Sequence, residues 1–351
     1  MKLSSVVALI LVGTLSSAGA QTVQLPRTVQ FQVACLDCTF GLPLMPTGIN
    51  SAGLVVANSP DLRRGFIIDY GQISVVPTFD GGWLNSANGI NDSGLVVGTS
   101  NGGVWNGHAG TFAYTWDGTT LTNLGDSINV YRDGFWSQAF AVNAAGQVAG
   151  QATSDFQTQS GFIYSAGVMT GIAFPDAFLT YATGINSHGR VVGTAEGDIF
   201  QAWTYKGGKL TNLNGNYARS DAFAVNDHDQ IAGDVRIDDG NGHVTGHAVV
   251  WDNSTTPTIL PSPPGRDFFP YGNGINNHGW VVGQACSAPF VDCVAVLSDV
   301  TTTINLNKHL DPFDKINWVL MNAVGINDAG QIIGTGTLYG EPQAFLATPV
   351  K

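Results

Sequence analysis

Three observations on the sequence predict an all-β fold, a seven-bladed β-propeller of four-stranded blades. A motif of ten residues built on Gly-Ile-Asn occurs seven times, at intervals that average about 46 residues. A second pair of short apolar strands follows most copies. Glycine contributes 45 of 351 residues and charged residues only 11%, a composition typical of short strands joined by tight turns.

Each copy of the motif is interpreted as a hairpin. The asparagine opens a turn, because its side chain can accept a hydrogen bond from the backbone two residues on. The glycine three positions later supplies the positive φ of a turn closed by a G1 bulge. In the fifth copy Asp229 replaces this glycine, and Asp also tolerates the left-handed region. The motif asparagines, which we assign to turn geometry and not to catalysis, are Asn50, Asn91, Asn143, Asn186, Asn226, Asn276 and Asn327.

The two ends of the chain predict how the ring closes. The seventh repeat stops after its third strand, whereas residues 28–33 form a surplus strand before the first motif. Placing the surplus strand fourth in the last blade completes seven blades and removes the free sheet edges. The same arithmetic makes the Gly-Ile-Asn strand the innermost strand of each blade.

The N-terminus predicts export. Residues 1–20 read as a signal peptide, with Lys2 before an apolar stretch at 6–12 and small residues at 18–20. Residues 21–351 then form a single propeller domain. No later stretch has the length of a membrane span. We therefore expect a secreted or periplasmic protein.

Four cysteines suit an oxidising compartment. They allow three pairings, of which we favour the two local ones: Cys35 with Cys38, and Cys286 with Cys293. The formal net charge is -12 and no basic cluster occurs. Nucleic acid and anionic membrane surfaces are therefore excluded as expected partners.

The repeat resembles a known family. The pattern Gly-Ile-Asn-Asp-x-Gly-x-Val-Val-Gly, followed by Ala-Phe-x-Trp, is similar to the HAF-type extracellular repeat of bacterial proteins. The resemblance spans about residues 46–348. It implies secretion and a propeller-like array. It implies no single activity, and no catalytic residue transfers from it.

The long, variable loops predict where a ligand binds, because loops on a rigid scaffold commonly carry function. These loops join second to third strands and fourth strands to the next first strands. The residue five positions before each motif asparagine should lie at the mouth of the channel. Adding two loop tryptophans, the predicted set is Met45, Ser86, Gln138, Tyr181, Asp221, Tyr271, Asn322, Trp136 and Trp318. The alternative interpretation is that any channel mouth is wet and therefore polar.

We expect a non-enzymatic binding protein for a glycan or another small polar ligand. The first alternative is a carbohydrate-active hydrolase or lyase that uses loop carboxylates, with Asp133, Asp221 and Asp267 as catalytic candidates. Tyr181 or Tyr271 would assist. The second alternative is an extracellular scaffold for protein interactions.

We expect no cofactor and no metal. His188, His228 and His278 share one position of the repeat, but equivalent turns should diverge around a ring. The aspartate-rich segment 238–242 lacks the closing glutamate of an EF-hand, so calcium there is only an alternative.

Overall fold

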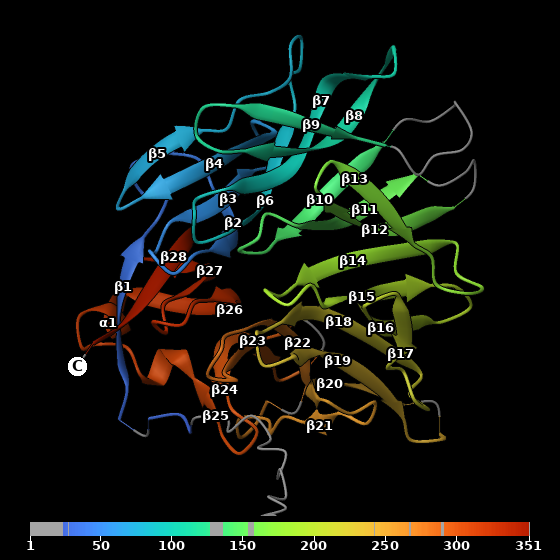
Figure 1. Ribbon diagram of the computed structural model, residues 1–351. Helices are drawn as coiled ribbons and strands as arrows, with labels where there is room; N and C mark the ends of the chain where they lie inside the picture. The colour runs from blue at the N-terminus through green and yellow to red at the C-terminus, as the bar shows by residue number, and fades with distance from the viewer. Residues whose placement is uncertain are drawn as a thin grey trace, which may run out of the picture.

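The computed structural model describes residues 24–26, 28–126, 136–153, 158–241, 243–266, 268–288 and 291–350. Almost all of these residues lie in strands or in the turns between them. Successive strand groups follow one another around the molecule from the N-terminal to the C-terminal end (Figure 1). Within the described ranges, no helix has the length and apolar composition needed to cross a bilayer.

The first two motif copies form two separate four-stranded antiparallel sheets. The first sheet comprises β2 (Met45–Ile49), β3 (Val55–Ser59), β4 (Arg64–Asp69) and β5 (Gln72–Val75). The second comprises β6 (Asn85–Ile90), β7 (Val96–Trp105), β8 (His108–Trp116) and β9 (Leu121–Gly125).

The next four copies form two eight-stranded sheets, each made of two antiparallel groups of four strands. One parallel pair joins the groups in each sheet: Gln159 with Leu179, and His247 with Phe269. The first sheet comprises β10 (Ser137–Val142), β11 (Val148–Thr153), β12 (Gln159–Ser165), β13 (Val168–Ile172), β14 (Leu179–Ile185), β15 (Val191–Glu196), β16 (Phe200–Lys206) and β17 (Lys209–Asn212). The second comprises β18 (Arg219–Val225), β19 (Gln230–Asp238), β20 (Val244–Asp252), β21 (Thr258–Ile259), β22 (Phe268–Ile275), β23 (Val281–Cys286), β24 (Val294–Ser298) and β25 (Thr303–Asn305).

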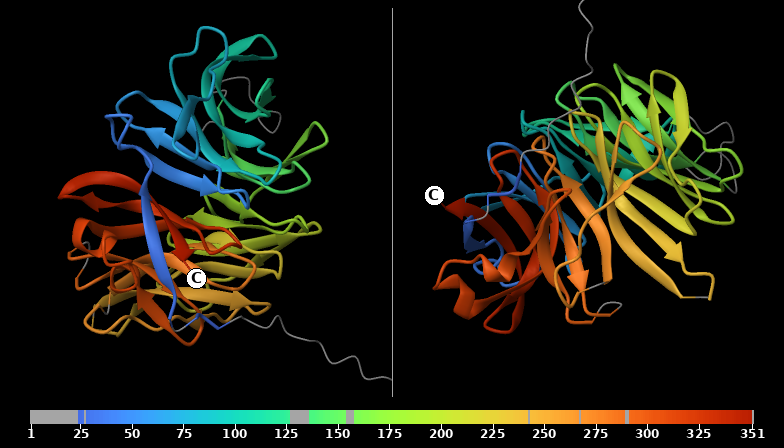
Figure 2. Two further views of the ribbon diagram at one scale, coloured as in Figure 1. Left: turned by 90° about the vertical axis from the view of Figure 1, so that its left-hand side faces the viewer. Right: turned by 90° about the horizontal axis from the view of Figure 1, so that it is seen from below.

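The last sheet combines both ends of the chain. Its strand order is β1 (Gln30–Cys35), β28 (Glu341–Val350), β27 (Ile332–Leu338) and β26 (Trp318–Ile326). The short helices η1 (Leu306–Lys308) and α1 (Asp314–Asn317) precede β26. Strand β1 runs antiparallel to β28 over six residue pairs, and Figure 2 shows β1 (blue) beside the last strands of the chain (red). The predicted closure by the N-terminal strand is confirmed.

The predicted all-β propeller class is confirmed, but the predicted count of separate sheets needs a correction. The described strands form five hydrogen-bonded sheets, not seven. The reason is physical: where two neighbouring groups of strands approach closely at one end, a single parallel bridge joins them. Each eight-stranded sheet therefore contains two copies of the motif.

A closed circuit of hydrogen bonds links the seven motif asparagines. In each, the Oδ1 atom accepts from backbone N–H groups within its own turn, as at Asn186, where the donors are His188 and Arg190 at 3.1 and 2.9 Å. The Nδ2 atom donates to the carbonyl of the next motif asparagine, from Asn50 through to Asn327. The amide of Asn327 donates back to the carbonyl of Asn50 at 2.9 Å. The asparagine therefore sets the turn, as predicted, and also joins each repeat to the next.

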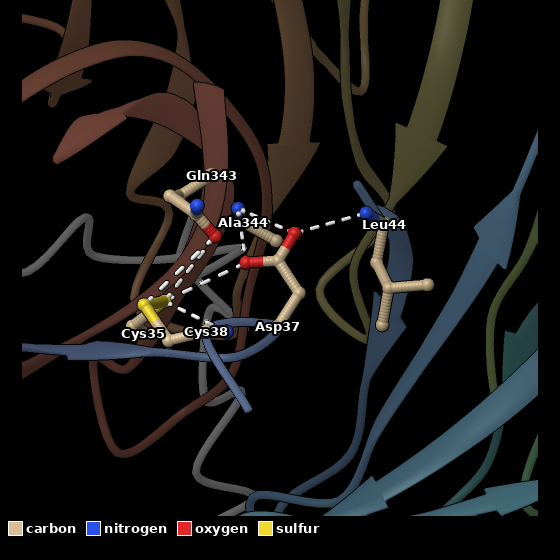
Figure 3. The surroundings of a disulfide bond; sticks show 6 residues. All are labelled: Cys35, Asp37, Cys38, Leu44, Gln343 and Ala344. Atoms are coloured by element: carbon tan, nitrogen blue, oxygen red, sulfur yellow. Dashed lines mark hydrogen bonds between the residues drawn. A yellow bond between two sulfur atoms is a disulfide. The ribbon is translucent and has the colours of Figure 1, made fainter. Parts of the chain in front are cut away.

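A buried carboxylate strengthens the closure beside the first disulfide (Figure 3). Asp37 accepts hydrogen bonds from the backbone N–H groups of Leu44, which enters the first sheet, and Ala344, which lies in the last. Burial raises the pKa of Asp37, although these N–H groups oppose the shift. Both predicted disulfides are confirmed: Cys35–Cys38 and Cys286–Cys293.

The last glycine of the motif makes room for an aromatic ring of the third strand. A Cβ on Gly193 would overlap the carbonyl oxygen of Tyr181 and lie 2.7 Å from the Trp203 ring. Trp203 is fully buried and packs with Ile185 and Val191. Close packing of this kind tolerates no added carbon atom, which explains why the position is glycine in most repeats.

Candidate functional site

The inner strands line a central channel, as the sequence predicted. Near the motif turns, a cavity of about 220 Å³ is bordered by every motif asparagine except Asn50 and by the residue that follows each of the seven. A second cavity, of about 300 Å³, is bordered by the Gly-Ile pairs and by the residues three positions before each asparagine. We call the first end the turn mouth, and the opposite end, where the long loops emerge, the loop mouth.

Several polar groups that line the channel have structural roles. The Thr183 hydroxyl donates to the carbonyl of Ala222 at 2.7 Å. The amide of Asn88 donates to Ala139 in the same way, at 2.7 Å. These bonds join neighbouring repeats, so the groups are not available to hold a ligand. The polar groups nearer the loop mouth are therefore the remaining candidates for contact with a ligand.

The predicted mouth residues begin the inner strands, and each pairs across to a residue on the second strand. All seven of these partners are polar. The cross-strand pairs are Met45 with Asn58, Ser86 with Thr99, Gln138 with Gln151, Tyr181 with Thr194, Asp221 with Asp234, Tyr271 with Gln284, and Asn322 with Thr335. These second-strand partners were not predicted from the sequence. The signal was present, since each partner directly follows the tenth residue of a motif copy.

The fifth repeat carries four charged side chains at this level, which we call the charge quartet. Arg219 and Asp221 on β18 lie opposite Arg236 and Asp234 on β19. Arg219 Nε and Asp221 Oδ2 form an ion pair at 2.6 Å. Arg236 Nε is 3.8 Å from Asp234 Oδ2, which is too long for a hydrogen bond. The quartet therefore contains one close ion pair, Arg219 with Asp221, whereas Arg236 and Asp234 are neighbours without a hydrogen bond.

Asp234 is the most strongly perturbed carboxyl group of the quartet. Its side chain is 0% exposed and neither oxygen has a hydrogen-bond partner among the described residues. Burial raises its pKa to about 8, and the neighbouring Asp221 adds to the rise, while Arg236 and Arg219 oppose it. At neutral pH, Asp234 therefore retains its proton.

Aromatic rings from the two flanking repeats surround the quartet. The Arg219 guanidinium lies over the Phe200 ring of the preceding repeat, 3.8 Å from the ring centroid. Tyr271 of the following repeat interacts electrostatically with Arg219 and packs edge-on against Phe223, with 6.2 Å between ring centroids. Burial raises the pKa of Tyr181 one repeat earlier, and the charge of Glu196 adds to this shift.

The other predicted residues divide into several environments. Asn322 accepts a hydrogen bond from the amide of Asn273 at 3.0 Å. Met45 is exposed, whereas Ser86 and Gln138 are half-buried. Trp136 is half-buried and forms an isolated bridge with Thr111.

Trp318 requires a correction. Its side chain is 5% exposed and belongs to a hydrophobic core cluster. The ring packs edge-on against Phe345, with 6.4 Å between centroids. The ring therefore lies in the core and cannot stack on a ligand. Asp133 and Asp267 lie outside the described residues.

The described parts of the chain contain no group of three or more His, Cys, Asp or Glu side chains placed to hold a metal ion. His278 packs against the Trp280 ring at 5.0 Å between centroids. His188 and His228 are exposed on their own turns. In the segment considered for calcium, Asp239 accepts hydrogen bonds from the backbone N–H groups of Asn241 and His243.

No protein-family model matches the chain, and no curated protein matches it in sequence. Solved structures share its fold. YCF48, in a complex with a D1 peptide, aligns with a TM-score of 0.55 at 10% identity, covering 96% of this chain and 100% of that one. A puromycin-hydrolysing peptidase from Mycobacterium tuberculosis aligns with a TM-score of 0.52 at 10% identity, covering 84% of this chain and 49% of that one. At such identities the likeness establishes the propeller scaffold alone.

Proposed function

We propose that the chain is a seven-bladed, exported propeller of the HAF-repeat type that binds a polar ligand of the glycan class at its loop mouth, without converting it. One observation carries this proposal. Of the fourteen side chains in the seven cross-strand pairs, all but Met45 are polar or hydroxylated, yet their identities differ from repeat to repeat. If these positions served only to hold the scaffold together, we would expect the same residue in every repeat, as at the motif asparagines.

The chemistry of the mouth fits a sugar. Tyr271 and Phe200 are half-buried aromatic side chains at this level, and the exposed part of such rings can pack on the apolar side of a pyranose. Carboxylate, amide and hydroxyl groups nearby can exchange hydrogen bonds with its hydroxyl groups. Binding sites commonly combine a few polar groups of this kind with aromatic walls.

Glycan-array binding followed by a reducing-end assay on the glycans that bind tests the proposal. We expect binding without release of reducing ends, and a loss of affinity of at least about tenfold in Tyr271→Ala. His228→Ala, on an exposed turn at the other mouth, is the matched control and should bind as the unchanged protein does. Failure to bind any glycan overturns the proposal.

A hydrolase or lyase is the second candidate, and the Asp221–Asp234 pair favours it. Asp234, whose pKa burial raises to about 8, lies opposite a second carboxyl group, and a carboxyl group with a raised pKa can act as a general acid. The burial of both groups counts against this candidate, since Asp221 is 4% exposed and Asp234 is 0% exposed. Release of reducing ends that disappears in Asp221→Asn would establish catalysis and replace the binding proposal.

A protein-interaction scaffold is the third candidate. Phe313, Ile316 and Tyr339 are exposed apolar side chains around α1, and the Tyr339 backbone N–H donates to the carbonyl of Asn317. Capture of one protein partner that is lost in Ile316→Asp, together with no glycan binding, would favour this candidate.

A further inference from the structure

The charge quartet differs from the six equivalent positions. In the other repeats, the equivalent positions contain one charged side chain, Glu196, which lies opposite Leu179. The fifth repeat instead places Asp221 opposite Asp234 and Arg219 opposite Arg236. Arginine is scarce here, because the whole chain has 14 basic residues against 26 acidic ones. Two arginines in direct cross-strand register therefore need an explanation.

Arg219 is held in place while part of it stays open. Its Nε is committed to Asp221 at 2.6 Å, and the guanidinium plane is supported by the Phe200 ring at 3.8 Å. Neither Nη atom forms a hydrogen bond with any described residue, and the side chain is 37% exposed. A guanidinium fixed on one edge and open on the other is preorganised to bind an acceptor.

Arg236 is open in a similar way. Its guanidinium forms no hydrogen bond with a described residue, and its contact with Asp234 is 3.8 Å long. Arg236 also borders a cavity of about 510 Å³, together with Tyr217 and the hydroxyl residues Thr255 and Thr256. Residues opposite one another in antiparallel strands lie about 5 Å apart at Cβ, so one anionic group can reach both guanidinium groups.

The balance of charge in the quartet favours the binding of an anion. Like charges directly opposite one another destabilise a strand pair. Asp221 offsets one guanidinium, but Asp234 is protonated at neutral pH and offsets nothing. The quartet therefore carries an excess positive charge in a chain of net charge -12.

We propose that the quartet is a subsite for the carboxylate of an acidic sugar, held between Arg219 and Arg236 with the sugar ring against Phe200 and Tyr271. The inference rests on the proposed function, since it names the glycan class. Guanidinium groups bind carboxylates in bidentate fashion, with short, charge-assisted hydrogen bonds. A sulfate or phosphate ester presents similar acceptors, so the test must separate these sources.

The test is calorimetric titration with an oligogalacturonate, its methyl ester, free galacturonate, a sulfated neutral oligosaccharide and inorganic phosphate. We expect the acid to bind at least about tenfold more tightly than its ester, which lacks the charge. Arg219→Gln and Arg236→Gln should each lower the affinity for the acid by about tenfold or more, with little change for the ester. Lys209→Gln, at the exposed first residue of β17, is the control and should change neither affinity.

Each outcome bears on one proposal. Equal affinity for acid and ester, or an unchanged affinity in both arginine variants, overturns the subsite while leaving the glycan proposal intact. Preference for the sulfated sugar or for phosphate overturns the carboxylate assignment. Binding of free galacturonate that depends on Arg219, with no oligosaccharide bound, supports the anion site and contradicts the glycan proposal.

A pH series supplies a second readout. The ionisable and charged groups around Asp234 are Asp221, Arg219, Arg236 and, further out, Tyr271. Because Asp234 becomes ionised as the pH rises through about 8, the affinity for the acidic sugar should fall severalfold there. Asp234→Asn mimics the protonated carboxyl group and should remove this fall. A fall that persists in the variant contradicts the charge argument.

Discussion

The same seven repeats build both mouths of the channel, but polar groups are hydrogen-bonded within the protein at one mouth and several are left without a partner at the other. At the turn mouth, the amide of each motif asparagine bonds its own turn and the next repeat. At the loop mouth, the hydroxyl groups of Thr99 and Thr194 and both oxygens of Asp234 are buried with no hydrogen-bond partner among the described residues. The turn mouth therefore stabilises the ring, whereas the loop mouth retains groups at a cost in stability, as functional sites do.

The aspartates of the turn mouth illustrate the difference. Asp92, Asp227 and Asp328 each accept a backbone N–H from the preceding repeat: Ser51, Ser187 and Asn277 respectively. Burial raises the pKa of Asp227, but the hydrogen bonds from Ser187 and Asn277 outweigh it, so the pKa is lowered. Asp234 at the loop mouth has no such donors, and its pKa is raised. The same residue type is structural at one mouth and perturbed at the other.

Removing a motif asparagine at the turn mouth should cause the largest loss in the free energy of unfolding. Asn226 is buried, donates to the carbonyl of Asn276 at 2.9 Å, and accepts from the N–H groups of His228 and Gln230. Asn226→Ala leaves these backbone groups unsatisfied, so we expect a loss of about 3 kcal/mol in the free energy of unfolding. Urea denaturation followed by tryptophan fluorescence measures it. His228→Ala, in the same turn but exposed, should change the free energy by less than about 0.5 kcal/mol; equal effects of the two variants would contradict the structural role of the amide.

Replacing the buried carboxyl group of Asp234 at the loop mouth should raise the free energy of unfolding. The pKa of Asp234 is raised in the folded state to about 8 and is about 3.9 in the unfolded chain, so folding loses stability as the pH rises between these values. Asp234→Asn removes this loss. We expect the variant to be more stable by on the order of 3 kcal/mol at pH 7, with the gain shrinking toward pH 4.

Thermal unfolding of both proteins between pH 4 and pH 8 checks this prediction. The gain should grow with pH throughout the interval, because each pH unit adds a further cost of keeping the proton on the buried carboxyl group. A variant that is less stable at pH 7, or a gain independent of pH, would show that Asp234 is ionised and stabilised by Arg236.

Much of the scaffold was predictable because it repeats. The asparagine turn, the innermost Gly-Ile-Asn strand, the closing strand and both local disulfides follow from spacing and turn chemistry. The fused sheets were not predictable, since a single bridge such as Gln159 with Leu179 depends on how closely two strand groups approach.

The arrangement of the candidate site could be predicted from the sequence only in part. Counting back from the asparagine located Asp221 and Tyr271, because register within one strand is fixed by the turn. The partner Asp234 and the stacking of Arg219 on Phe200 depend on contacts across strands and between repeats. Trp318 was misplaced because an aromatic residue beside a long loop gives no indication in the sequence of whether it points outward or into the core.

The smallest predicted change in the free energy of unfolding concerns a turn glycine, where the cost of backbone geometry can be separated from the cost of packing. Gly94 has a φ of +83°, and a Cβ added there would meet no atom within 4 Å. Gly94→Ala should therefore cost only the strain of the left-handed backbone, about 1 kcal/mol. Gly94→Asn should cost less, because the equivalent Asp229 adopts a φ of +65° and asparagine also tolerates that region. Urea denaturation of the three proteins gives the order: an alanine variant as stable as the asparagine variant would show that the turn does not require positive φ at this position.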